Sequence, residues 1–366
     1  MKIKLSLLIT FVTPLFLINC SGKPNIPKPT QNHQPITANH QNVIYPTVIQ
    51  PQRQPKPRAE NQVLLGNPIK TTPIRPPTAV KEIVKTPTHQ NSMVKGTTSL
   101  SKKFKLPNKI KESSGLIKID GRLWTINDSG GRAELYQIDE KSGRIVKTVT
   151  IKGAYNHDWE ALTYDENHVY IGDFGNNKGN RRDLKVYKIS RKALKSQKNV
   201  RAKIINFRFS DQKNFRSRRQ KHDFDCEAMV AYHGKLYLFS KDWVDHKTRL
   251  YELSTSAGTH IAKYRDNFNV QGLITDASIN RKLDILLLTS YSELLSVDIW
   301  TFTNFNQENF FKGLSKKLTL NSLNAQVEGV TFIDNYRAYL SSEAFSKYIF
   351  SFDANLYKID FSREFK

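Results

Sequence analysis

The chain has 366 residues, a formal net charge of +24 and two cysteines. Two cysteines cannot build the disulfide framework of a small secreted scaffold. The sequence contains no G-x-S-x-G elbow, P-loop, H-E-x-x-H or C-x-x-C pattern. This excludes the common serine-hydrolase, nucleotide-binding and zinc classes.

The chain begins with a segment typical of export. Two lysines precede an apolar run over residues 5–18, which Pro14 interrupts. The run is too short for a spanning helix and suits a signal peptide. Leu17-Ile18-Asn19-Cys20 resembles the lipobox of bacterial lipoproteins, in which the cysteine becomes the acylated first residue. We therefore predict a lipoprotein signal peptide at 1–20, with palmitate on Cys20. An ordinary secretory signal with a chance cysteine is the alternative.

The segment after Cys20 is expected to tether a folded domain to the cell envelope. Ser21 follows the cysteine in place of an aspartate. By resemblance to enterobacterial sorting, this favours the outer membrane over the inner membrane. Residues 21–100 hold thirteen of the fifteen prolines and show no sustained period of 2 or 3.6. Such a segment cannot bury enough apolar surface to fold, so we predict a disordered linker there and a domain at 101–366.

A short pattern recurs five times in residues 101–366. It reads acid, apolar residue, acid, small residue, large apolar residue, and the small residue returns at intervals of 44 to 67 residues. Repeats in this range are typical of propellers, solenoids and repeat arrays. The variants are Glu112-Ser113-Ser114-Gly115-Leu116, Asp158-Trp159-Glu160-Ala161-Leu162, Asp225-Cys226-Glu227-Ala228-Met229, Asn269-Val270-Gln271-Gly272-Leu273 and Gln326-Val327-Glu328-Gly329-Val330.

Short strand patterns follow each repeat. A second strand follows every repeat, as at 123–126 and 169–171, and third and fourth strands are readable in most units. Four antiparallel strands per unit predict an all-β fold, a β-propeller with five four-stranded blades. Residues 103–106 would supply the missing strand of the last blade and close the ring. Six blades are the alternative if 191–221 hides a degenerate blade. A two-sheet sandwich is less favoured, because it gives the repeat no role.

Four segments of the first two predicted blades carry a family resemblance. They read E-S-S-G-L at 112–116, N-D-S-G-G at 127–131, D-W-E-A at 158–161 and G-D-F-G-N-N at 172–177. Together they resemble a family of bacterial exported and lipid-anchored β-propeller proteins, mostly without an assigned activity. The resemblance implies fold and export rather than a reaction. More distantly, the strand starts resemble phytase-like and gluconolactonase-like propellers, in which acids at the mouth hold calcium or another divalent ion.

In an antiparallel blade, the start of the first strand and the end of the second lie on the same face of the ring. The repeat acids and the polar ends of the second strands should therefore converge on one mouth of the central channel. The predicted strand ends are Asn127, Asp173, Ser240, Ser290 and Ser342. The predicted mouth acids are Glu112, Asp128, Asp158, Glu160, Asp173, Asp225, Glu227 and Glu328, with Asp242 and Glu343 from the following loops.

Carboxylates gathered in this way cannot all stay ionised without a cation nearby. Oxygen ligands suit Ca²⁺ first and Mg²⁺ second. Two other interpretations stay open: each acid could accept backbone N–H bonds from the next blade and lock the ring, or the acids could be catalytic without a metal. The catalytic candidates are His157, Asp158 and Glu160. The candidate metal ligands are Asp158, Glu160, Asp173, Glu227 and Glu328.

Several other residues stand out near the repeat. His222 precedes a repeat acid, and Lys241 ends a second strand, where it could meet a phosphate or pair with a mouth acid. Cys226 lies between two acids, which oppose thiolate formation, so we expect it to pack as a small apolar residue. The densest basic region is 178–221, a solvated face or an anion-binding surface. Its candidate residues are Arg181, Arg182, Arg218 and Arg219.

The sequence thus predicts a monomeric, lipid-anchored envelope protein whose propeller is a ligand- or partner-binding module with a divalent cation at its acidic mouth. An anionic envelope component such as lipopolysaccharide fits the basic charge. Nucleic acid is not expected, because the basic region lacks aromatic stacking platforms. The alternative function is a metal-dependent hydrolase, a phosphoesterase or lactonase, using the same acids.

Overall fold

The structure is a computed structural model, and it describes residues 99–292, 296–347 and 350–365. All of these belong to one compact part of the chain, Glu82–Lys366. Cys20, the predicted signal peptide and the predicted linker up to residue 98 lie outside the described residues. The first described element is strand β1 (Ser99–Lys105).

The fold is mainly β. The described residues form five antiparallel sets of four strands, which we call units 1 to 5 in chain order. The first strands are β2 (Ser113–Ile119), β6 (Trp159–Tyr164), β11 (Asp225–Tyr232), β15 (Leu273–Asn280) and β19 (Val327–Phe332). The second strands are β3 (Arg122–Asn127), β7 (His168–Asp173), β12 (Lys235–Lys241), β16 (Ile285–Tyr291) and β20 (Arg337–Ser342). The third strands are β4 (Glu134–Ile138), β8 (Lys185–Ser190), β13 (Thr248–Ser254), β17 (Ser296–Thr303) and β23 (Asn355–Asp360). The outer strands are β5 (Ile145–Lys152), β10 (Lys203–Phe209), β14 (Gly258–Phe268), β18 (Leu314–Asn324) and β1.

Parallel pairs join three units at their outer strands. β10 pairs parallel with β14, so units 2 and 3 form one eight-stranded sheet. β9 (Asn199–Arg201) leaves unit 2 and pairs parallel with β5 of unit 1. A helix, α1 (Arg191–Ser196), precedes β9. The stretch 191–221, in which a sixth blade could have been hidden, therefore adds strands to units 1 and 2 and forms no separate sheet.

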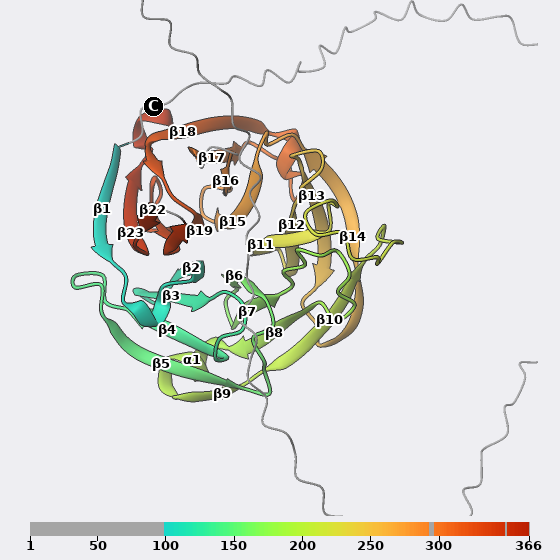
Figure 1. Cartoon of the computed structure of the whole chain (residues 1–366), viewed down its shortest axis with the longest axis horizontal. Helices are drawn as coiled ribbons and strands as arrows, with labels where there is room; N and C mark the ends of the chain where they lie inside the picture. The colour runs from blue at the N-terminus through green and yellow to red at the C-terminus, as the bar shows by residue number, and fades with distance from the viewer. Residues whose placement is uncertain (1–98, 293–295, 348–349, 366) are drawn as a thin grey trace, which may run out of the picture. The chain divides into compact units, whose positions relative to one another are not determined.

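The first strands contact one another in a closed cycle, in the order β2, β6, β11, β15, β19 and back to β2. Figure 1 shows these strands near the centre of the folded part, with β1, β5, β10, β14 and β18 at its rim. A hydrophobic cluster lies between each pair of successive units. Between units 1 and 2, for example, Trp124 and Trp159 are buried together. Each interface therefore has its own apolar core.

Most strands agree with the pattern read from the sequence. β1 pairs antiparallel with β23, which confirms that residues before the first repeat supply the outer strand of unit 5. β17 was not predicted, although it forms the third strand of unit 4. A short hairpin joins β21 (Phe345–Lys347) to β22 (Phe350–Phe352). Short 3₁₀ turns occur at Asn108–Ile110, Phe310–Lys312 and Ser362–Phe365. The helices of the described part are all too short or too polar to cross a membrane.

Candidate metal centre

Each first strand carries a β-bulge near its start, opposite the end of the second strand. A bulge inserts one unpaired residue into the ladder and re-aims its side chain. The bulged residues of units 1 to 5 are Gly115, Glu160, Glu227, Thr275 and Glu328. The same backbone device therefore places three glutamates at equivalent positions.

Three second strands end at the predicted Asn127, Asp173 and Ser342, whereas β12 and β16 run one residue past the predicted Ser240 and Ser290. Each second strand ends opposite the start of its first strand. The residues that follow or close these strands are Asp128, Phe174, Lys241, Tyr291 and Glu343. They face, in the same order, Glu112, Asp158, Asp225, Leu273 and Gln326. We call these ten residues and the five bulged residues the mouth.

Unit 4 corrects one predicted repeat. Residues 269–272 precede β15, and the bulge of this strand is at Thr275. A small residue is needed at 272 because the backbone of Tyr291 lies close to it: a Cβ added at Gly272 would lie 2.9 Å from the carbonyl oxygen of Tyr291. Gly272 therefore matched the pattern without being part of the bulge. Unit 4 therefore presents Leu273, Thr275 and Tyr291 at the mouth, with no acid at these positions.

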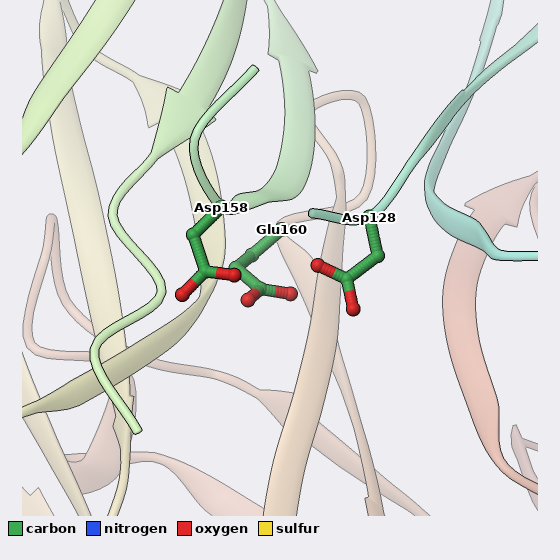
Figure 2. A group of neighbouring side chains, drawn as sticks. All are labelled: Asp128, Asp158 and Glu160. Carbon is green, nitrogen blue, oxygen red and sulfur yellow. The ribbon is translucent and has the colours of Figure 1, made fainter. Parts of the chain in front are cut away.

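Three mouth carboxylates come together. Oxygen atoms of Asp128, Asp158 and Glu160 all lie within 4.8 Å of one another. Figure 2 shows the three side chains converging from two segments, the end of β3 and the start of β6. Glu160 is buried, while Asp128 and Asp158 are partly exposed. We call this group the acid trio; it unites two predicted metal ligands with a third acid that was predicted only for the mouth.

Backbone hydrogen bonds around the acid trio join three of the four segments that carried the family resemblance. Phe174 and Gly175 both donate their N–H to the carbonyl oxygen of Asp158, at 3.1 and 3.2 Å. The side-chain amide of Asn156 donates to the carbonyl oxygens of Asn127 and Asp128, at 3.0 and 2.7 Å. The loop after β7 and the turn after β3 are thus tied to the segment that carries Asp158.

Burial and mutual repulsion raise the pKa values of all three carboxyl groups of the trio. Burial, together with nearby carboxylates, raises the pKa of Asp128 to about 6 and that of Asp158 to about 8. Burial and then the charge of Asp128 raise the pKa of Glu160 well above its usual range. Two ionised carboxylates 4.8 Å apart repel by about 3 kcal/mol at an effective dielectric constant of about 20. A cation at this point would relieve that repulsion.

The carboxylates of Asp158 and Glu160 receive no hydrogen bond within the part of the chain that the structure describes. Asp128 accepts one, from the backbone N–H of Ser129. The trio therefore keeps most of its oxygen lone pairs available. Hard cations such as Ca²⁺ and Mg²⁺ take carboxylate oxygens as ligands, and both fit this donor set.

Arg181 and Asp173 are engaged with each other, which corrects two predicted roles. Nη2 of Arg181 lies 2.8 Å from Oδ1 of Asp173, and Nη1 donates to the carbonyl oxygen of Gly175 at 2.8 Å. The Arg181 side chain is 9% exposed. Arg181 thus braces the loop after β7 instead of forming an anion-binding surface. Asp173 neutralises this arginine instead of joining the trio.

The other two predicted metal ligands differ in their partners. Oε2 of Glu227 lies 3.4 Å from Nζ of Lys241, so Glu227 already has a cation. Glu328 is 7% exposed, and its Oε2 is buried without a hydrogen-bond partner among the described residues. Burial raises the pKa of Glu328 to about 7. Neither side chain belongs to the acid trio.

A second group of acids, Asp223, Asp242 and Asp245, also lies close together. Arg249 is within ion-pair distance of all three, at 2.9 Å from Asp242 and 3.4 and 3.9 Å from the others. Its guanidinium therefore occupies the position that a metal ion would need.

Two acids outside the trio do accept backbone N–H bonds from a neighbouring unit, as the second interpretation of the acids expected. Oδ2 of Asp276 accepts the N–H of Val330 at 2.7 Å, which ties unit 4 to unit 5. Oδ1 of Asp225 accepts the N–H of Asn176 at 2.5 Å, which ties unit 3 to unit 2. Asp276 is completely buried. The sequence reading missed it, although an aspartate within a buried strand was a signal for such a role.

The histidines and Cys226 lie outside the trio. His157 is exposed, with Nδ1 3.4 Å from Oδ2 of Asp183. His222 is buried, with its Nδ1 accepting the N–H of Phe224 and its Nε2 3.1 Å from the carbonyl oxygen of Asn177. Cys226 is buried, and burial raises the pKa of its thiol well above the usual range. Its expected role as a small packed residue agrees with this position.

The remaining predicted anion-binding residues are at the surface. Arg182 is exposed, and its guanidinium carbon lies 4.0 Å from the centroid of the Phe215 ring. Arg218 and Arg219 are also exposed. The N–H of Arg218 donates to the carbonyl oxygen of Lys178, which joins their loop to the loop after β7.

Arg281 lies just after the end of β15, at the other ends of the first strands from the mouth. Arg281 of unit 4 donates from Nε to the carbonyl oxygen of Ala231 at 3.1 Å and also to that of Tyr164. A cavity of about 30 Å³ beside it has room for a water molecule or two.

A scan against models of protein families finds no match to this chain, and a search of curated proteins finds none either. The functional argument therefore depends on the geometry of the mouth.

Proposed function

We propose that the folded part is a five-bladed β-propeller and that units 1 to 5 are its blades. The closed cycle of first-strand contacts supports this assignment. So do the five clusters that each lie between successive units. The pairing of β1 with β23 supplies the outer strand of the last blade from the start of the domain, which leaves that blade complete.

We further propose that the acid trio binds one divalent cation, Ca²⁺ in preference to Mg²⁺. The observation that carries this proposal is the approach of Asp128, Asp158 and Glu160 to within 4.8 Å without an arginine or lysine paired to them in the described residues. The second acid group, Asp223, Asp242 and Asp245, differs from the trio in this respect, because Arg249 neutralises it. Ca²⁺ tolerates irregular ligand geometry better than Mg²⁺ does, which suits three carboxylates on two separate segments.

The proposed role of the cation is to bind an anionic ligand. Asp128 and Asp158 are partly exposed, so an ion held by them would keep coordination positions toward the solvent. The basic loop with Arg182, Arg218 and Arg219 packs onto the loop that contacts the trio. Lipopolysaccharide phosphates, which carry several negative charges, fit a cation flanked by basic side chains. Anchoring through Cys20 at the outer membrane would place the domain beside such a ligand.

Binding is proposed in preference to hydrolysis. His157, the candidate general base, pairs with Asp183 at the surface, and Lys241 pairs with Glu227. The described residues thus place no unpaired histidine or lysine beside the acid trio. The alternative function is metal-dependent hydrolysis of a phosphoester or lactone. Turnover of such a substrate by the purified protein would replace the binding proposal.

The test is binding of the purified protein to vesicles with and without lipopolysaccharide, in Ca²⁺ or in EDTA. Wild type should bind lipopolysaccharide vesicles in Ca²⁺ only, and Glu160→Gln should bind them weakly in both conditions. Glu166→Gln is the matched control, because Glu166 is an exposed glutamate at the other end of the same β6–β7 hairpin. Equal binding by wild type in Ca²⁺ and EDTA would overturn the cation-dependent role.

A further inference from the structure

Lys241 is a buried cation within the mouth. It is 6% exposed and closes the second strand of unit 3, at the position that Asp128 holds in unit 1. Its Nζ lies 3.4 Å from Oε2 of Glu227. The same atom lies 5.3 Å from the ring centroids of Trp243 and Tyr291. A lysine is rarely buried this far unless carboxylates hold it there.

The acids around Lys241 form the second half of the mouth. Glu227, Glu328 and Asp225 all act on the ammonium group electrostatically. Oε2 of Glu328 is buried and has no hydrogen-bond partner in the described part of the chain. An unpartnered carboxylate oxygen in a buried position needs a cation or a proton nearby. Lys241 supplies a positive charge in direct contact with Glu227, whereas no lysine or arginine of the described residues lies within ion-pair distance of the acid trio.

The inference about Lys241 rests on the proposed cation site. We infer that the ammonium group of Lys241 takes the place of a second divalent cation, and so limits the mouth to one bound ion. Without this group, Glu227 and Glu328 would be two buried carboxylates with no counter-ion, close to Asp225. Hard cations take carboxylate oxygens as ligands, and Glu227 and Glu328 would then have no other counter-ion. Lys241 would therefore set the number of metal ions and keep the second half of the mouth closed to metals.

The test is the number of Ca²⁺ ions per chain, measured on the purified full-length protein by calorimetric titration and by metal analysis after dialysis. Wild type should bind one ion, and Lys241→Met should bind two. Lys317→Met is the matched control: Lys317 also lies beside a carboxylate, 2.9 Å from Asp298, and 5.5 Å from the Trp300 ring, but on an outer strand. The Lys317→Met protein should bind one ion, as wild type does.

The outcomes separate this inference from the proposed function. One ion in wild type and one in Lys241→Met would overturn the role of Lys241 and leave the acid trio as the metal site. No ion in wild type would overturn both. Lys241→Gln removes the same charge but can still donate a hydrogen bond to Glu227, so it gives a second count if Lys241→Met does not fold. A count of one in Lys241→Gln as well would also reject the inference.

Discussion

Gly175 lies directly against the carboxylate of Glu160. A Cβ added at Gly175 would lie 2.1 Å from Oε1 of Glu160 and 2.5 Å from Oδ2 of Asp158. The side-chain ends of both acids therefore occupy the space that any other residue at 175 would fill. The second glycine of the G-D-F-G-N-N segment is thus a condition for the geometry of the acid trio.

Gly175→Ala should abolish cation binding while the protein still folds. The new methyl group meets the ends of two flexible side chains, which can rotate away, so the cost falls on the trio rather than on the backbone. Calorimetric titration with Ca²⁺ should show at least a tenfold loss of affinity. Gly131→Ala is the control, because its Cβ would meet its nearest neighbour at an ordinary 3.7 Å. Equal affinity in both variants would contradict this account.

Asp276→Ala should destabilise the fold whether or not a cation is present. It leaves the buried N–H of Val330 without an acceptor, which costs about 1–3 kcal/mol. Asp276→Asn should be much milder, since the amide oxygen can accept the same hydrogen bond. Denaturant unfolding in Ca²⁺ and in EDTA measures both variants. If the loss in Asp276→Ala disappeared in EDTA, Asp276 would belong to the cation site instead.

The metal-free protein should lose stability as the pH rises from about 5 to 8. Burial raises the pKa of Asp128 to about 6 and that of Asp158 to about 8, so the folded state keeps protons that the unfolded chain releases near pH 4. This stabilisation is complete below pH 4 and is lost as the pH passes through the two raised values. Since one unit of pKa shift corresponds to about 1.4 kcal/mol, the free energy of unfolding should fall by several kcal/mol. Thermal melts across this range should show the fall, and saturating Ca²⁺ should reduce it. A free energy of unfolding that rises with pH over this range would contradict the raised pKa values of Asp128 and Asp158.

Cys20→Ser should release the protein from the membrane. The proposed anchor is a single acylated cysteine, and the described part of the chain offers no spanning helix in its place. Labelling with palmitate and cell fractionation measure the two consequences, loss of label and movement to the soluble fraction. A variant that stayed in the membrane fraction without label would show that another contact, such as the basic surface, holds the protein there.

The sequence predicted the strands well because the signals were local. Residues 123–126 and 169–171 are short apolar runs with an aromatic residue in each, and both are strands in the structure. The site was predicted only in part, because it depends on contacts across units. The pairing of Asp173 with Arg181 and of Glu227 with Lys241 decides which acids keep free oxygens, and spacing along the chain does not report such pairs. The repeat of unit 4 was misplaced for a similar reason, since the sequence match at Gly272 reflects a close approach to Tyr291.

The most direct test of the central claim is the effect of a chelator on the melting temperature of wild type and of Glu160→Gln. A bound ion stabilises the fold by about 2.7 kcal/mol at a hundredfold excess over its dissociation constant. EDTA should therefore lower the melting temperature of wild type by roughly 5 to 10 °C. Glu160→Gln should melt at nearly the same temperature with and without EDTA. A wild-type melting curve that EDTA leaves unchanged, together with no bound metal by mass spectrometry, would contradict the cation site at Asp128, Asp158 and Glu160.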